Sequence, residues 1–207
     1  VPSLSDMEEI EISNRLFHDA QADYMTVVLP GLSVTKTAIA GPVTFILARD
    51  RLVTVRHHAP RPFETFPDRA DKATAGCASA ERIFLGLIEE CIARLADLLE
   101  GVGRELDTVS ASVFSGTATQ RPDLLQVALE KTGQQGDLLN RIRLGLLTLD
   151  RAMGFYAQTV IERPEGKALR GVARSQMRDL QALEVHADYL SSRIGLAVDA
   201  TLGMVNL

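Results

Sequence analysis

Apolar residues follow two different patterns along this chain. In the last two thirds they recur at steps of three and four, the spacing of one buried helix face. This pattern predicts three long helices, from about Ala78 to Val109, from about Arg121 to Thr159, and from about Lys167 to Leu207. The predicted breaks between them are Ser115-Gly116-Thr117 and Pro164-Glu165-Gly166.

The first seventy residues are different, because three shorter segments there have β-like composition. They are Asp23 to Leu32, Gly41 to Ala48 and Arg51 to Arg56. Only Arg49-Asp50 separates the last two, which is the spacing of a tight hairpin whose turn type stays open. Before them, we expect one short helix that ends near Phe17.

That first helix carries its own start signal. Either Ser3 or Ser5 can cap its N-terminus, and Glu8 is placed as a capping-box partner for Ser5. Together these patterns predict an α+β fold, with a partial, mostly antiparallel sheet followed by long helices. We expect residues 1–70 to be the remnant of an α/β subdomain and residues 71–207 to be a helical subdomain.

The third long helix has a heptad-like seam of apolar and small residues. About forty residues span roughly 60 Å, which is too long for a compact domain of this size. We therefore expect a projecting stalk helix from about residue 167, and its seam predicts self-association or continuation into a further segment. The seam residues are Leu183, Ala187, Leu190, Ile194, Ala197, Thr201 and Met204.

Composition excludes several classes of function. The formal net charge is -5 and the chain has no Trp, which argues against nucleic-acid binding. Cys77 and Cys91 form neither a disulfide framework nor a CxxC pair, so a reducing environment and structural roles are expected. No nucleophile, base and acid pattern or Gly-rich phosphate loop is present, so we expect no enzyme activity.

The two ends of the sequence suggest a longer protein. The chain begins without Met and with acidic rather than basic residues, unlike a secretory signal. No apolar run approaches the ~20 residues of a membrane-spanning helix. The last helical pattern reaches Leu207 without a cap, so we expect both ends to be boundaries within a longer chain.

Three segments in this order resemble the CorA family of divalent-cation channels, and its magnesium branch in particular. Met7 to Leu16 is similar to the family's acidic helix with an Ile-Glu-x-Ser-x-Arg core, and Phe45 to Arg56 is similar to its strand hairpin. Asp199 to Asn206 resembles the end of the stalk helix near the inner mouth of the pore. Gly203-Met204-Val205-Asn206 is not the family's Gly-Met-Asn signature, which the resemblance places beyond Leu207.

The resemblance implies a homopentamer with a central pore, at the cytoplasmic face of the bacterial inner (plasma) membrane. It implies that membrane helices follow this chain and that the first strand and helix of the sheet precede it. The cytoplasmic part would bind regulatory Mg²⁺ between subunits and close the channel, and the full protein would carry magnesium, cobalt or nickel. Partners would be further copies of the chain, divalent cations and the membrane, and not nucleic acid.

Candidate metal ligands follow from the same resemblance. Asp179 best matches the stalk aspartate of the family's regulatory site. The family's partner acid has no counterpart near Thr35, so Glu105 and Asp107 are possible substitutes. Asp199 could face the funnel axis and concentrate cations. An ordinary solvated helix face is the competing interpretation for these acids.

Two other functions remain open at this stage. One is a zinc transporter of the related ZntB branch, against which the Asp-Ala-Thr-Leu-Gly-Met stretch at 199–204 argues. The other is a helical scaffold whose third helix forms a dimeric coiled coil. The four histidines do not suggest a zinc site, because His57 and His58 are adjacent and point to opposite sides of an extended chain.

Overall fold

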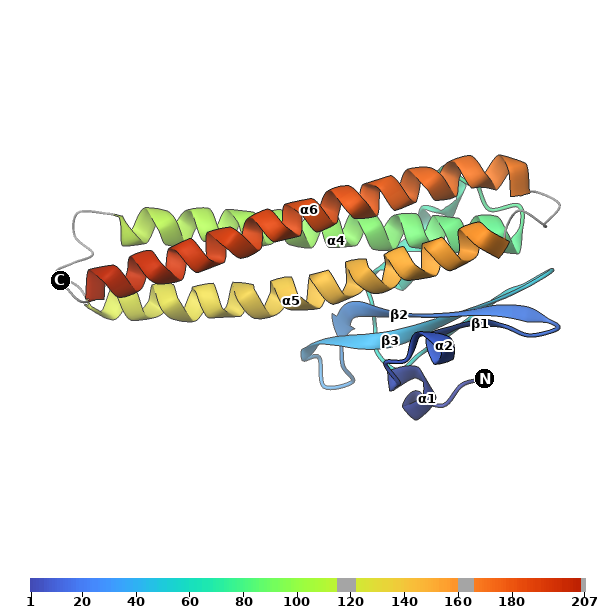
Figure 1. Ribbon diagram of the computed structural model, residues 1–207, viewed down its shortest axis with the longest axis horizontal. Coiled ribbons are helices and arrows are strands. Elements are labelled where there is room, and N and C mark those ends of the chain that lie inside the picture. Colours follow the sequence, from blue (N-terminus) through green and yellow to red (C-terminus); the bar gives the residue numbers. More distant parts are fainter. Residues whose placement is uncertain (115–121, 160–165, 206–207) are drawn as a thin grey trace.

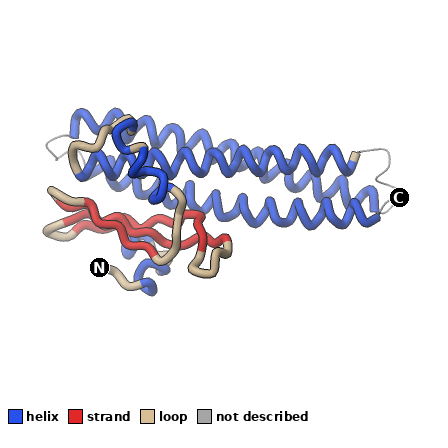
Figure 2. The backbone as a smooth tube through the Cα atoms, turned by 180° about the vertical axis from the view of Figure 1, so that it is seen from behind, coloured by secondary structure: helices blue, strands red, loops and turns tan. Residues whose placement is uncertain are grey.

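The computed structural model describes residues 1–114, 122–159 and 166–205. A four-stranded sheet lies against one part of an elongated bundle of three long helices (Figure 1). The view from behind shows the same two layers, with the N-terminus beside the sheet and the C-terminus at the far end of the bundle (Figure 2). The predicted α+β class, sheet first and long helices after it, is confirmed.

The sheet is antiparallel and its strands follow sequence order. They are β1 (Leu16–His18), β2 (Ala22–Leu32), β3 (Ala38–Ala48) and β4 (Leu52–Arg56). Side chains alternate between the two faces of a strand, and one face of β2 and β3 packs into the core through Met25, Val27, Leu29, Val43, Phe45 and Leu47. The sheet therefore joins the helices through a continuous apolar layer.

The predicted hairpin at Arg49-Asp50 is confirmed. The backbone N–H of Ala48 donates to the carbonyl of Arg51 at 3.0 Å, closing a two-residue turn. A type I′ turn needs positive φ at both central residues. Among the described non-glycine residues only Lys36 has positive φ, at 60°, so this turn is not of that type.

The N-terminal segment differs from the single helix expected to reach Phe17. Helix α1 spans Leu4–Glu8, α2 spans Ile12–Arg15, and strand β1 starts directly after it. Ser3 caps α1 and forms a capping box with Asp6, so the expected pairing of Ser5 with Glu8 is wrong. The strand is stabilised by the ring of Phe17, which stacks on Tyr24 of β2 with centroids 4.6 Å apart.

Short helical turns connect the sheet to the bundle. They are the short helix α3 (Pro62–Thr65) and two 3₁₀ turns, η1 (Phe66–Asp68) and η2 (Ala70–Lys72). Ser79 then caps the first long helix, because its hydroxyl accepts the backbone N–H of Arg82.

Three helices of similar length form the bundle. They are α4 (Ala80–Val113), α5 (Pro122–Thr159) and α6 (Gly166–Val205), and each runs antiparallel to the one before it (Figure 1). Helix α5 is continuous through Gly133 and Gly136. The predicted break at 115–117 lies outside the described residues, as do Pro164 and Glu165 of the second break.

The seam of α6 finds its partners within the same chain. Ala187 and Leu190 are buried in the main core, and Leu183 and Ile194 pack against it. The bundle as a whole extends beyond the sheet, so α6 projects together with α4 and α5 and not alone (Figure 1). This seam therefore does not by itself require a second copy or a dimeric coiled coil.

Aromatic side chains fix the sheet to the bundle. The ring of Phe45 in β3 meets Phe84 of α4 edge-on, with centroids 5.4 Å apart. Phe84 in turn contacts Tyr156 of α5 at 5.1 Å. Helix α6 joins the same core through Gln176, whose Nε2 donates to the carbonyl of Leu85 at 2.9 Å.

Candidate functional site

The four acids predicted as metal ligands all lie exposed on the bundle. Glu105 and Asp107 are on α4, and Asp179 and Asp199 are on α6. Residues two positions apart on an α-helix are rotated by roughly 200° from each other, so Glu105 and Asp107 point to different sides of α4. The structure does not bring the four acids together.

Asp107 is engaged in a contact between helices. Its Oδ1 accepts a hydrogen bond from Nη2 of Arg193 at 2.6 Å, which joins α4 to α6. The Arg193 side chain is only 24% exposed, and its guanidinium lies 5.9 Å from the ring centroid of Tyr189. This position suits a cross-helix ion pair better than a metal ligand.

Glu105 on α4 has no hydrogen-bond or ion-pair partner among the described residues. On α6, Asp179 and Asp199 also have uncommitted oxygens. Neither carboxylate forms a hydrogen bond or ion pair with another residue in the described ranges. They are twenty residues apart on α6, which is roughly 30 Å along the axis and roughly 200° around it. One ion therefore cannot bind both within a single copy.

Acidic residues also line a groove between α5 and α6, which the sequence did not predict as a site. Nη2 of Arg143 on α5 contacts Oδ1 of Asp188 on α6 at 2.9 Å. Glu184 lies one turn before Asp188, and both line a groove of about 400 Å³ with Arg143 and Leu147. The i, i+4 spacing of Glu184 and Asp188 could have shown from the sequence that both acids lie on one face of the helix. It could not have shown that this face lies against α5.

The surroundings of Glu184 in this groove disfavour the ionised form of its carboxyl group. Burial raises the pKa of Glu184, and the nearby negative charges of Asp150 and Asp188 raise it further, while Arg143 opposes them. The salt bridge thus neutralises only part of the negative charge that α5 and α6 place at their contact.

The donor set in one copy does not form a chelating metal site. Among residues 1–114, 122–159 and 166–205, no group of three or more His, Cys, Asp or Glu side chains could hold a metal ion. Mg²⁺ commonly keeps several waters and takes only one or two carboxylates from protein. The isolated carboxylates of Asp179 and Asp199 are compatible in number with that mode of binding.

Comparison with known proteins identifies the family. The family model described as CorA-like Mg²⁺ transporter protein matches residues 2–201. The chain belongs to this family.

Curated CorA relatives agree with this assignment. The chain is 24% identical over 205 residues to the magnesium transport protein CorA of Haemophilus influenzae, a match that covers 99% of this chain and 63% of that protein. It is 26% identical over 202 residues to that of Yersinia pseudotuberculosis, covering 98% and 62%. The chain thus spans a little under two thirds of the length of these CorA relatives.

Solved structures share the fold. The ZntB cytoplasmic domain of Vibrio parahaemolyticus superposes with a TM-score of 0.67 at 12% identity, covering 98% of this chain and 78% of that one. The soluble domain of CorA from Methanocaldococcus jannaschii gives 0.67 at 12% identity, covering 98% and 79%. In this CorA-family chain, no helix within the described ranges has the length and apolarity needed to span a membrane.

Among the histidine and cysteine side chains, His58 and Cys91 are buried in the fold. His58 is buried, and its Nε2–H donates to the carbonyl of Leu29 at 2.9 Å. A Cβ at Gly41 would lie 2.8 Å from the imidazole, so the ring occupies space that this glycine leaves open. Cys91 is buried, which raises the pKa of its thiol, and Cys77 is exposed.

Proposed function

We propose that this chain is the cytoplasmic, Mg²⁺-sensing and gating domain of a homopentameric CorA-type magnesium channel that also takes cobalt or nickel. The observation that carries this proposal is the CorA-family match over residues 2–201, together with the curated magnesium transport relatives. The domain would lie at the cytoplasmic face of the bacterial inner membrane and be joined to membrane helices outside these 207 residues. It would act as a binding and gating module, not as an enzyme.

The proposed sensor uses exposed carboxylates of α6 between copies of the chain. Asp179 is the first candidate ligand and Asp199 the second, because both have oxygens that no described residue occupies. Carboxylates from neighbouring copies repel one another without metal and are bridged when hydrated Mg²⁺ binds. Metal binding would therefore shift the population toward the closed assembly.

A titration of this 207-residue chain tests the sensor. Mg²⁺ at millimolar concentration should raise the melting temperature or promote association, because the ion binds the assembled folded state. Asp179→Asn should weaken that response, and Asp97→Asn is a matched control on an exposed carboxylate of α4. All samples need equal ionic strength. If neither quantity moves with Mg²⁺, or if both variants respond alike, the sensor assignment is wrong.

The fold leaves the zinc alternative open. The ZntB and CorA soluble domains match the fold with the same TM-score of 0.67, so the fold does not separate the two branches. Structural zinc prefers sulfur and nitrogen ligands, and the described residues include no cluster of three His, Cys or acidic side chains. A larger thermal response to micromolar Zn²⁺ than to millimolar Mg²⁺ would favour the ZntB branch.

A further inference from the structure

Three arginines from three separate elements line one pocket at the junction of the sheet and the bundle. They are Arg61 at the start of α3, Arg94 on α4 and Arg141 on α5. We propose that this pocket binds a small organic anion, whose phosphate or carboxylate head is held by the guanidinium groups. The proposal is independent of the metal-sensing function.

The charge of the pocket is not balanced by the protein. Glu64 is the one carboxylate among the lining residues, and it forms no ion pair with any of the three arginines. By contrast, Arg69, Arg143 and Arg193 each contact a carboxylate at 3.0 Å or less. Three arginines line this one pocket in a chain of net charge -5, and the planar guanidinium is well suited to paired hydrogen bonds with phosphate or carboxylate.

The backbone around Arg61 is fixed on both sides. Ala59 and Leu32 exchange two backbone hydrogen bonds, of 2.9 and 3.2 Å, which hold the segment against the end of β2. The hydroxyl of Thr65 contacts the carbonyl of Arg61 at 3.3 Å. The backbone of Arg61 is therefore held beside the pocket by the fold.

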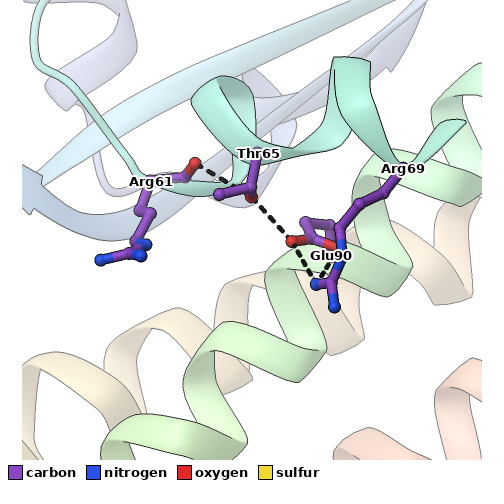
Figure 3. A network of polar contacts seen from close by, with 4 residues as sticks. All are labelled: Arg61, Thr65, Arg69 and Glu90. Carbon is purple, nitrogen blue, oxygen red and sulfur yellow. Dashed lines mark hydrogen bonds and ion pairs between the residues drawn. The ribbon is translucent and has the colours of Figure 1, made fainter.

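The nearby carboxylate of Glu90 does not neutralise Arg61. Its Oε1 accepts from the hydroxyl of Thr65 at 2.7 Å and from Nη1 of Arg69 at 3.0 Å. Figure 3 shows that the guanidinium of Arg61 points away from this network, while Arg69 reaches into it. Thr65 and Arg69 thus occupy Glu90 and leave the charge of Arg61 for the pocket.

Arg141 is held in place while most of its donors stay available. Its Nη1 donates to the backbone carbonyl of Ala38 at 2.9 Å, a contact that orients the guanidinium without neutralising its charge. An arginine has five N–H donors in a planar fork, so Arg141 can still offer a pair to a bound anion. Neither Arg61 nor Arg94 has an ion-pair partner in the part of the chain that the structure describes.

The remaining walls set the size and character of the ligand. The cavity measures about 260 Å³, below the range of about 300–1,000 Å³ of drug-sized sites. Its apolar walls suit a short organic body attached to the anionic head. They are formed by Pro30, Leu32, Ile39, Ala59, Leu98 and Leu138. These features favour a small phosphomonoester or a short dicarboxylate.

Binding can be measured on the intact 207-residue chain. The probes are inorganic phosphate, glycerol 3-phosphate and malonate, titrated calorimetrically and in thermal melts, with chloride at equal ionic strength as the reference. We expect saturable binding with at least one probe and a melting temperature that rises with its concentration, because the ligand binds across the sheet and bundle. A preference for glycerol 3-phosphate or malonate distinguishes a phosphate head from a carboxylate head.

Variants decide whether the pocket is responsible. Arg94→Gln and Arg61→Gln should each weaken binding about tenfold or more, as loss of a charge-assisted hydrogen bond predicts. Arg94→Lys should restore only part of the affinity, because lysine lacks the planar fork. Arg174→Gln, an exposed arginine of α6 outside the pocket, should leave binding unchanged.

Three results would overturn the proposal. One is no saturable binding of any probe, and another is equal loss in the Arg174→Gln control, which indicates general charge screening. The third is a change of oligomeric state in Arg94→Gln without anion binding, which indicates an acidic segment of another copy as the occupant. Melting curves of each variant without ligand separate lost binding from lost folding.

Discussion

The backbone N–H of Val28 in β2 donates a hydrogen bond of 2.9 Å to Oγ1 of Thr148 in α5, across 120 positions of sequence. Strand β1 pairs only with Asp23 to Met25, so it does not reach Val28. The Thr148 hydroxyl also contacts the carbonyl of Leu144 at 2.9 Å, which orients its oxygen toward the strand. A helix side chain thus satisfies a backbone donor at the open edge of the sheet.

Replacing this hydroxyl should weaken the contact between sheet and bundle. Thr148→Val keeps the volume but leaves the N–H of Val28 buried without an acceptor, which costs about 1–3 kcal/mol. Urea unfolding measures the difference, and Thr148→Ser, which keeps the hydroxyl, should lose much less. Equal stability of the valine variant and the original chain would show that the hydrogen bond contributes nothing net.

The sequence predicted the long helices well because the spacing of apolar residues within each helix depends only on that segment of the chain. The three-residue strand β1 was missed because the pairing of Phe17 with Tyr24, not a local period, makes that segment a strand. The heptad-like seam of α6 was visible, but not that Ala187 and Leu190 pack within the same chain. A periodic stripe predicts that a face is buried and does not say against which helix.

The sequence allowed acidic residues to be named as candidate ligands, but it did not show which residues would lie next to them in the fold. Asp107 is paired with Arg193, 86 positions away, and that pairing depends on how α4 and α6 lie against each other. The three arginines of the pocket come from α5, α4 and the start of α3, so no sequence motif joins them. Asp179 and Asp199 stay predicted ligands, since their partners would belong to another copy.

His58 should make the stability of this chain depend on pH. Burial lowers the pKa of His58 below its ordinary 6.5, although the hydrogen bond to Leu29 opposes the shift. The unfolded chain therefore binds the proton first as pH falls, so stability is full above about 6.5 and decreases toward the folded pKa. The loss cannot exceed about 1.4 kcal/mol per pH unit for one group.

Urea unfolding at neutral and mildly acidic pH measures this dependence. His58→Gln has no titrating ring and should show a smaller decrease of stability with falling pH than the original chain. His57→Gln changes the exposed neighbour and serves as the control. If His58→Gln keeps the full decrease, another group causes it.

Glu184 should limit stability at neutral pH. Its pKa is raised by burial first and by Asp150 and Asp188 next, so the folded state binds the proton more tightly than the unfolded state does. Glu184→Gln removes an unfavourable charge and should raise the melting temperature at pH 7. The gain should vanish as pH falls below the ordinary value of 4.5, where both states hold the proton.

The exposed Glu105 provides the comparison for this change. Glu105→Gln should leave the melting temperature nearly unchanged at neutral pH, because its side chain is solvated. A lower melting temperature of Glu184→Gln at pH 7 would contradict the prediction. It would mean that attraction to Arg143 outweighs the two causes that raise the pKa.

Substitution of Asp107 distinguishes an acid with a structural role from an acid that binds the sensed ion. Asp107→Asn weakens a pair whose two side chains are 71% and 24% exposed, so unfolding stability should fall by about 1 kcal/mol or less. The response of the melting temperature to Mg²⁺ should stay intact, because Arg193 already occupies this carboxylate. Asp179→Asn should show the opposite pattern, with unchanged stability without metal and a weaker Mg²⁺ response. If Asp107→Asn instead abolishes the response, Asp107 binds the ion and Arg193 must move aside when it does.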